Sequence, residues 1–230
     1  MKKLLRGEKK RSYVRQMFDR IAPKYDFMNR LISFGLDQRW RRKGLESVNV
    51  GTKDILVDIA CGTGDIVELA SSMGATAIGL DFSSKMLYVA KLRNMYDNFI
   101  QGDACLLPFK NASIDVVTCG FALRNFADLG NAIEEMGRAL VPGGRLMFLE
   151  VCSPKNPLLK AGHAFYFQKV VPFIGAVLAD KNAYAYLPQS VAYLPPVHEL
   201  FALLHGAGFS NVRRKMFFLN AAQLITGIRK

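Results

Sequence analysis

Short apolar runs alternate with longer amphipathic stretches through the middle of the chain. The runs are rich in Ile, Leu and Val, which is typical of strands buried on both faces of a parallel sheet. They cover residues 55–60, 76–81, 98–101, 114–119 and 146–151. The stretches between them predict helices; the one at 65–72 begins with an acidic residue, and the one at 129–140 is ended by a Pro-Gly-Gly breaker at 142–144. This order predicts one α/β sheet with helices on both faces.

The pattern changes after the fifth run. Residues 153–200 are rich in aromatic side chains and proline, and we expect them to form helices over the carboxyl edge of the sheet, where ligands bind in such folds. Together with the N-terminal helices they would enclose an apolar substrate pocket. A further helix is expected at 197–207, and a hairpin of residues 211–218 and 221–228 would complete the sheet.

Positive charge is concentrated near the N-terminus. The chain carries a formal net charge of +12, and residues 1–53 contain 15 Lys or Arg against 5 Asp or Glu. Amphipathic spacing predicts helices at 12–21 and 31–45, whereas residues 1–11 are expected to form a solvated, partly disordered tail. The alternative is attraction of this region to phosphate groups, either of nucleic acid or of anionic lipids, which composition does not separate.

Cysteine usage and hydropathy indicate a cytoplasmic protein. The cysteines are Cys61, Cys105, Cys119 and Cys152. They form no Cys-x-x-Cys pair, so we expect reduced thiols, with neither a disulfide framework nor a metal site. The charged N-terminus argues against a signal peptide, and the most apolar later stretch, residues 161–179, is interrupted by polar residues and proline, which makes it a poor membrane span.

A glycine turn follows the first predicted strand. Asp58, Gly62 and Gly64 form an Asp-x-x-x-Gly-x-Gly pattern that leads into the helix at 65–72. Such a turn lets a ligand approach the backbone, and the free N–H groups of the helix start face it. The third small residue of a dinucleotide fingerprint is missing, because Val67 stands there. A lone Gly-x-Gly is common, so this turn alone is a weak signal of a nucleotide site.

Two carboxylates follow the next two strands. Asp81 lies 19 residues after Gly62, where a carboxylate can accept hydrogen bonds from the ribose of an adenosine cofactor. Asp81 could instead cap the next helix, and Asp65 could only complement a helix dipole. Asp103 follows the third strand. The order and spacing resemble motif I and its partners in class I S-adenosylmethionine (SAM) methyltransferases, in which a residue like Asp103 lies beside the adenine amino group.

Longer segments resemble the ubiquinone/menaquinone biosynthesis C-methyltransferases over nearly the whole chain. The most specific are Tyr-Asp-Phe-Met-Asn at 25–29 and Leu-Arg-Asn at 123–125. The other matching segments are residues 18–24, 58–65, 102–104, 107–109, 121–122, 142–144, 186–190 and 207–209. The resemblance implies a class I SAM-methyltransferase Rossmann-like fold with a seven-stranded, mostly parallel sheet and a helical insertion after strand five.

The implied organisation is a single methyltransferase domain. Its parts would be a basic N-terminal helical segment at 1–50, a SAM-binding core at 51–152, a substrate cover at 153–200, and the end of a helix with a hairpin at 201–230.

The resemblance also implies the reaction. The methyl group of SAM would be transferred to a ring carbon of a reduced polyprenyl quinone, chiefly demethylmenaquinol, with a benzoquinol precursor of ubiquinone left open. The protein would touch an anionic membrane surface peripherally through its basic N-terminal region; a homodimer is left open, and neither nucleic acid nor a metal is expected. The cofactor-binding residues would be Asp58, Gly62, Thr63, Gly64, Asp81, Phe82, Asp103, Ala104 and Gly120.

The resemblance places Tyr25, Arg124 and Asn125 near the quinol. A ring carbon becomes nucleophilic when the neighbouring hydroxyl loses its proton, so the enzyme must stabilise a phenolate. The fixed charge of Arg124 would lower the pKa of the phenol and orient a water, while Tyr25 and Asn125 would hydrogen-bond the ring oxygens. The alternative for Arg124 is a purely structural pair with Asp128.

Other residues depart from the pattern or fall outside it. Gly120 stands where many family members have Ser, which removes a hydroxyl contact to the cofactor, and Ala122 replaces a Gly. The chain also ends without the usual His-x-Gly. No role is assigned to the histidines, which are His163, His198 and His205.

Three other functions stay open at this point. An RNA methyltransferase would suit the basic N-terminus, but the fourth strand is not followed by Asn/Asp-Pro-Pro-Tyr, and no Pro-Cys nucleophile is present. A methyltransferase of another small molecule would share motif I. A SAM-binding subunit of a quinone-synthesis assembly without catalysis would share most of the segments, although the intact Arg124-Asn125 pair argues against it.

Overall fold

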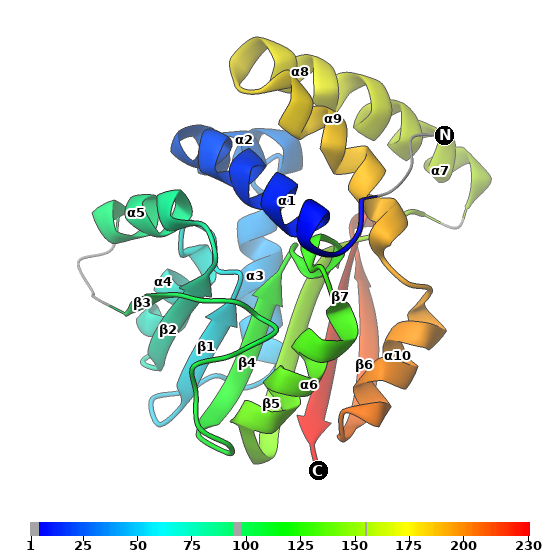
Figure 1. Cartoon of the computed structure of the whole chain (residues 1–230). Helices are drawn as coiled ribbons and strands as arrows, with labels where there is room; N and C mark the ends of the chain where they lie inside the picture. The colour runs from blue at the N-terminus through cyan, green and yellow to red at the C-terminus, as the bar shows by residue number, and fades with distance from the viewer. Residues whose placement is uncertain (1–4, 94–97, 155) are drawn as a thin grey trace.

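Seven strands form one sheet in the order β3-β2-β1-β4-β5-β7-β6 (Figure 1). The computed structural model describes residues 5–93, 98–154 and 156–230. The strands are β1 (Ile55–Ile59), β2 (Thr76–Asp81), β3 (Phe99–Gln101), β4 (Ile114–Gly120), β5 (Leu140–Val151), β6 (Phe209–Phe217) and β7 (Ala222–Arg229). All neighbours pair in parallel except β7, which runs antiparallel to both β5 and β6. The predicted fold class and the closing hairpin are therefore confirmed.

Helices cover both faces of the sheet. One face packs against α6 (Leu129–Ala139) and α10 (Val197–Gly206), and the other against α3 (Leu36–Ser47), α4 (Asp65–Ser72) and α5 (Ser84–Arg93). The strands carry apolar side chains on both faces of the sheet, and the helices bury them, as the continuous Ile, Leu and Val runs predicted. The cysteines of the described chain are all free.

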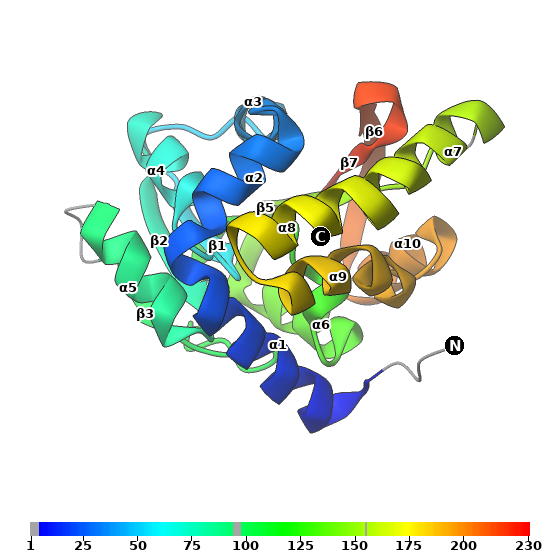
Figure 2. The same ribbon diagram turned by 90° about the horizontal axis from the view of Figure 1, so that it is seen from above.

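A third layer, here called the cap, lies over the carboxyl edge of the sheet (Figure 2). It consists of α1 (Gly7–Ile21), η1 (Ala22–Lys24), α2 (Tyr25–Ser33), α7 (Pro157–Phe165), η3 (Tyr166–Val170), α8 (Val171–Leu178), α9 (Lys181–Ser190) and η4 (Val191–Tyr193). A separate apolar cluster joins α1, α2, α8 and α9 to Met86 of α5. The helical insertion after β5 is therefore present, and it shares the cap with the N-terminal helices.

Two sequence predictions about the N-terminal region are wrong. The expected helix at 31–45 is two helices, because Phe34 (φ 54°) and Gly35 (φ 71°) adopt left-handed backbone and break the chain between α2 and α3. The expected tail at 1–11 is helical from Gly7 onwards. Lys10 is buried; its Nζ donates to the Phe126 carbonyl at 2.6 Å and lies 4.0 Å from the centre of the Tyr193 ring. Residues 1–4 lie outside the described chain.

The boundary before β5 also differs from the prediction. α6 ends at Ala139, but the strand begins at Leu140 rather than at residue 146, so the Pro-Gly-Gly segment lies within the irregular start of β5. Within the described residues, no helix combines the length and apolar character needed to cross a membrane.

Candidate active site

Two cavities lie between the cap and the carboxyl edge of the sheet. The smaller has a volume of about 240 Å³ and the larger about 460 Å³. Four residues line both cavities: Phe18, Tyr25, Phe121 and Asn125. The two cavities are therefore adjacent, with these four side chains between them.

The smaller cavity contains most of the residues predicted to bind the cofactor. Its lining includes Gly62, Asp81, Phe82, Asp103, Ala104 and Gly120. They converge because β1, β2, β3 and β4 are neighbours that all end at the same edge. Spacing along the sequence predicted this for Gly62 and Asp81, and the family resemblance for the other residues.

Asp81 organises the glycine turn from the end of β2. It is 5% exposed, and its two carboxylate oxygens accept hydrogen bonds from the N–H groups of Gly62 (2.9 Å) and Ser83 (2.8 Å). Burial raises its pKa to about 6. The alternative role of Asp81 as helix cap is wrong, because the Ser83 hydroxyl accepts from the Met86 N–H at 3.1 Å and caps α5 instead.

Asp103 is held from two sides. Its Oδ1 accepts from the Cys105 N–H at 2.9 Å, and its Oδ2 pairs with Nη2 of Arg11 at 2.7 Å. Arg11 also lines the smaller cavity, together with Gly7 and Glu8 from the same end of α1. Sequence reasoning missed Arg11 because it treated this segment as a solvated tail.

Three predicted cofactor residues do not line the cavity. Asp58 is buried between β1 and β4, where the Thr118 hydroxyl donates to it at 2.7 Å, and burial raises its pKa to about 7. The Thr63 hydroxyl donates to Asp26 of α2. Gly64 has a φ of 88° and precedes α4 as its N-cap. These residues lie in or next to the glycine turn but outside the cavity lining, so their contact with a cofactor stays a prediction.

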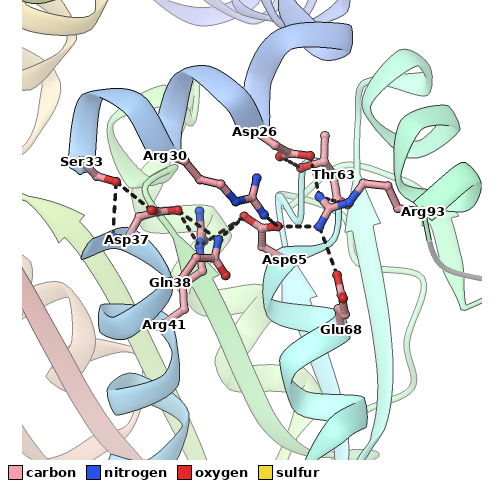
Figure 3. A network of polar contacts seen from close by, with 10 residues as sticks. All are labelled: Asp26, Arg30, Ser33, Asp37, Gln38, Arg41, Thr63, Asp65, Glu68 and Arg93. Atoms are coloured by element: carbon pink, nitrogen blue, oxygen red, sulfur yellow. Dashed lines mark hydrogen bonds and ion pairs between the residues drawn. The ribbon is translucent and has the colours of Figure 1, made fainter. Parts of the chain in front are cut away.

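An ion network fastens α2 and α3 to the start of α4 (Figure 3). At its centre Asp65, which is 5% exposed, pairs with Arg30 (3.4 Å), Arg41 (3.6 Å) and Arg93 (3.0 Å). Burial alone would raise the pKa of Asp65, but the guanidinium groups of Arg41 and Arg93, together with the Gln38 hydrogen bond, hold it below its ordinary value. Asp65 therefore does more than complement a helix dipole, since it joins the cap to the cofactor turn.

Arg124 and Asn125 lie in η2 (Leu123–Asn125), directly after β4. Arg124 is 6% exposed and lines the larger cavity; its guanidinium pairs with Glu150 of β5 and donates to the Ser190 hydroxyl at 2.9 Å. The alternative pair with Asp128 is wrong, because the Asp128 carboxylate caps α6 by accepting from the Asn131 N–H at 3.0 Å.

Tyr25 and Asn125 belong to the wall between the two cavities. The Tyr186 hydroxyl donates to Asn125 Oδ1 at 3.2 Å, which fixes that amide. Burial raises the pKa of Tyr25, although Arg41, Asn29 and Arg124 each oppose the shift. The Tyr25 hydroxyl is therefore protonated at neutral pH and available as a donor.

Unpartnered polar atoms gather in the larger cavity. In the described chain, the buried side-chain nitrogen and oxygen atoms without a hydrogen-bond partner are Arg41 Nε, His163 Nε2 and the Tyr184 hydroxyl, and all three residues line this cavity. Arg41 Nε still faces the Asp65 carboxylate as an ion pair at 3.6 Å. Burial lowers the pKa of His163 and raises that of Tyr184, so both are neutral. Buried polar groups are rarely left unpaired outside functional sites. No sequence spacing links these three positions, which meet only in the fold.

Known proteins resemble this chain along almost all of its length. The model of the ubiE/COQ5 methyltransferase family matches residues 6–229. The demethylmenaquinone methyltransferase of Roseiflexus sp. (strain RS-1) is 43% identical over 228 residues, which cover 97% of this chain and 96% of that protein. The ubiquinone/menaquinone biosynthesis C-methyltransferase UbiE of Geotalea uraniireducens (strain Rf4) is 39% identical over 217 residues, 90% of this chain and 91% of that protein.

Solved structures share the fold at lower identity. Phosphoethanolamine N-methyltransferase 2 of Haemonchus contortus, in complex with S-adenosyl-L-methionine, superposes with a TM-score of 0.67 at 17% identity, over 94% of this chain and 60% of that one. Because the family model spans nearly every residue and full-length relatives agree with it, this chain belongs to the ubiE/COQ5 methyltransferase family.

Proposed function

We propose that this protein transfers the methyl group of SAM to a ring carbon of a prenylated quinol and converts demethylmenaquinol to menaquinol. The observation that carries the proposal is the pair of adjacent cavities, one lined by most of the predicted cofactor residues and the other mainly by apolar side chains. An apolar cavity with a few unpaired polar atoms suits a large apolar ligand that carries two ring oxygens. The names of the relatives described above supply the quinone class.

The lining of the smaller cavity fits SAM. Asp81 presents a carboxylate for the ribose, and Leu80, Phe82 and Ala104 supply apolar walls for a base. A Cβ at Gly120 would lie 2.8 Å from Ile66 Cδ1 and 2.9 Å from Arg41 Nη1, so a serine at this position would require the ends of these two side chains to shift. When bound, SAM supplies an electrophilic methyl group.

The residues of this chain would prepare the quinol. The charge of Arg124, partly offset by Glu150, favours the deprotonated ring hydroxyl, and Tyr25 and Asn125 sit where the ring would approach the cofactor. Alignment of the ring carbon with the methyl group would supply the rest of the acceleration, and the residues between the two cavities are the ones that would hold both molecules in place. We also propose peripheral contact with an anionic membrane and a homodimer. Analytical ultracentrifugation of the purified protein tests the homodimer.

The reaction is tested with labelled SAM. The purified protein is offered chemically reduced demethylmenaquinol, a benzoquinol precursor of ubiquinone, and bulk RNA side by side. We expect label in the naphthoquinol. Label only in RNA, or in none of these while SAM still binds, would refute the proposed function.

SAM affinity is expected to fall in acid. Ionised Asp81 is the stronger acceptor for the two ribose hydroxyls, and its pKa is about 6, so affinity should drop by up to about tenfold per pH unit below that value. Isothermal titration across the range from about pH 5 to 8 measures this. In Asp81→Asn the affinity should be lower and nearly independent of pH; an unchanged slope in that variant would assign the titration to another group.

The contribution of Asp81 to folding stability changes with pH in the opposite direction to its contribution to SAM affinity. Its pKa is raised in the folded protein, so this carboxyl contributes stability below its unfolded pKa of about 4 and loses it as the pH rises through about 6. Weaker SAM binding in acid is therefore not explained by unfolding through this group.

Tyr184→Phe should separate binding from stability. Removing a buried hydroxyl that has no partner is expected to raise the free energy of unfolding by about 1 kcal/mol, while the KM for quinol rises about fivefold and kcat stays nearly constant. Tyr186→Phe is the matched control, because its hydroxyl already bonds Asn125 and its loss should lower stability by about 1 kcal/mol. A Tyr184→Phe variant with unchanged KM would exclude this hydroxyl from substrate binding.

A further inference from the structure

Exposed apolar side chains surround the opening of the larger cavity. Four of its lining residues are more than half exposed, and they come from three distant segments: Phe34 (77%), Leu158 (82%), Phe218 (57%) and Leu219 (62%). We call these four residues the rim. They mark the place where the cavity meets solvent, and none of them is polar.

Three of the four rim residues have a backbone conformation that is unfavourable for large side chains. Phe34 (φ 54°), Phe218 (φ 38°) and Leu219 (φ 51°) occupy the left-handed region, which bulky side chains rarely adopt. Such conformations persist where surrounding structure enforces them, and they cluster at functional sites. Here they turn three large apolar side chains outward at one opening.

The helical segment beside the rim is also apolar and buries few of its side chains. α7 and η3 have no buried residue, and α8 buries only Val171 and Gly175. Phe165 (65%), Phe173 (70%) and Val177 (67%) are exposed along it. Residues seven or four apart lie on the same face of a helix, as Leu158 and Phe165 do, and as Phe173 and Val177 do. Phe165 and Phe173 are eight apart, but the wider π-helical turn η3 lies between them and absorbs one residue. Helical spacing therefore places these four side chains along one stripe.

Charge along this segment has one sign. Residues 157–179 contain no Asp or Glu, and Lys160 and Lys169 are exposed. α7, η3 and α8 run across the outside of the cap in both views (Figures 1 and 2). An apolar stripe flanked by lysines is the composition of a helix that lies in the interface of an anionic bilayer.

We propose that the rim and the α7–α8 stripe dock on an anionic lipid bilayer, so that the tail of a prenylated ligand passes from the larger cavity directly into the membrane. The inference rests on the proposed function for the identity of that ligand. It assigns the membrane contact to this surface and not to the basic N-terminal segment, in which Lys10 is buried and Arg11 is paired with Asp103 while Lys9 and Arg15 are exposed.

Sedimentation of the full-length protein with vesicles tests the surface. Vesicles of phosphatidylcholine with phosphatidylglycerol are compared with phosphatidylcholine alone. In Phe165→Glu/Phe173→Glu the bound fraction should fall at least tenfold, because two apolar side chains leave the bilayer and two anions face it. The matched control is Leu92→Glu, which is 70% exposed on α5 and lies outside the stripe; it should bind like the unmodified protein.

A second readout separates this inference from the proposed function. Phe165 and Phe173 do not line the cavities, so methyl transfer to a short-chain, water-soluble quinol should be unchanged in the double variant. Loss of vesicle binding with a fully inactive parent protein would uphold the docking surface and refute the quinol reaction.

Three results would overturn the docking surface. One is unchanged vesicle binding by the double variant. Another is loss of binding on neutralising Lys9 and Arg15 of α1 instead. The third is a parent dimer that the double variant converts to a monomer without any change in vesicle binding, which would mean that a second copy of the chain covers the stripe.

Discussion

Arg124→Met is expected to lower kcat for quinol methylation by about 10²- to 10³-fold, the usual cost of removing one charge-stabilising donor. The same change should lower the free energy of unfolding by about 3 to 5 kcal/mol, because Glu150, which is 1% exposed, would remain as a buried charge without its partner. Steady-state methyl transfer and denaturant unfolding measure the two effects.

The double variant Arg124→Met/Glu150→Gln distinguishes catalysis from folding. Removing the second charge should restore most of the stability, because a buried pair is costly to break and nearly neutral to replace. SAM affinity should stay close to that of the parent protein, since neither residue lines the smaller cavity. If methyl transfer returned together with stability, Arg124 would be a structural residue only.

Asp65→Asn is expected to lower the free energy of unfolding by about 3 to 5 kcal/mol. An amide cannot neutralise three guanidinium groups, and Arg41, which is 5% exposed, would be left with only the longer contact to Asp37 (3.8 Å). Because the pKa of Asp65 is lowered in the folded protein, its contribution is present above about pH 4 and is lost as the pH falls through the folded value. The difference from the parent protein should therefore shrink in acid.

Glu68→Gln is the matched control for Asp65. Glu68 pairs with the same Arg93 at 3.1 Å but is 57% exposed, so its removal should change stability by less than about 0.5 kcal/mol. Equal losses in the two variants, measured by urea unfolding, would mean that burial does not set the strength of this network.

The core of the fold could be predicted because its elements are local. Each buried strand is a continuous apolar run, and the glycine turn with Asp81 follows from spacing along successive β-α units. The predicted boundary of the helix at 31–45 was wrong because the backbone conformation of one residue ends the helix there. Phe34 takes a left-handed conformation that its side chain does not favour, and this splits an otherwise regular amphipathic stretch.

The site was only partly predictable, because some of its residues are joined by tertiary packing. Arg11 reaches Asp103 from a segment whose composition predicted a tail. Arg41 and Tyr184 come from α3 and α9, which are neighbours of the same cavity but have no relation in sequence. Glu150, the partner of Arg124, is buried within the apolar strand β5, and no periodicity in the sequence indicates that it faces Arg124. Side chains that meet across the cap therefore require the folded chain.

The shared wall has a thermodynamic consequence. Phe18, Tyr25, Phe121 and Asn125 belong to both cavities, so a ligand that moves or orders them on one side changes the free energy of binding on the other. Such coupling is reciprocal: the factor by which the first ligand alters the dissociation constant of the second is also the factor in reverse. If the spent cofactor and the methylated quinol order these same four side chains, each product changes the dissociation constant of the other by the same factor.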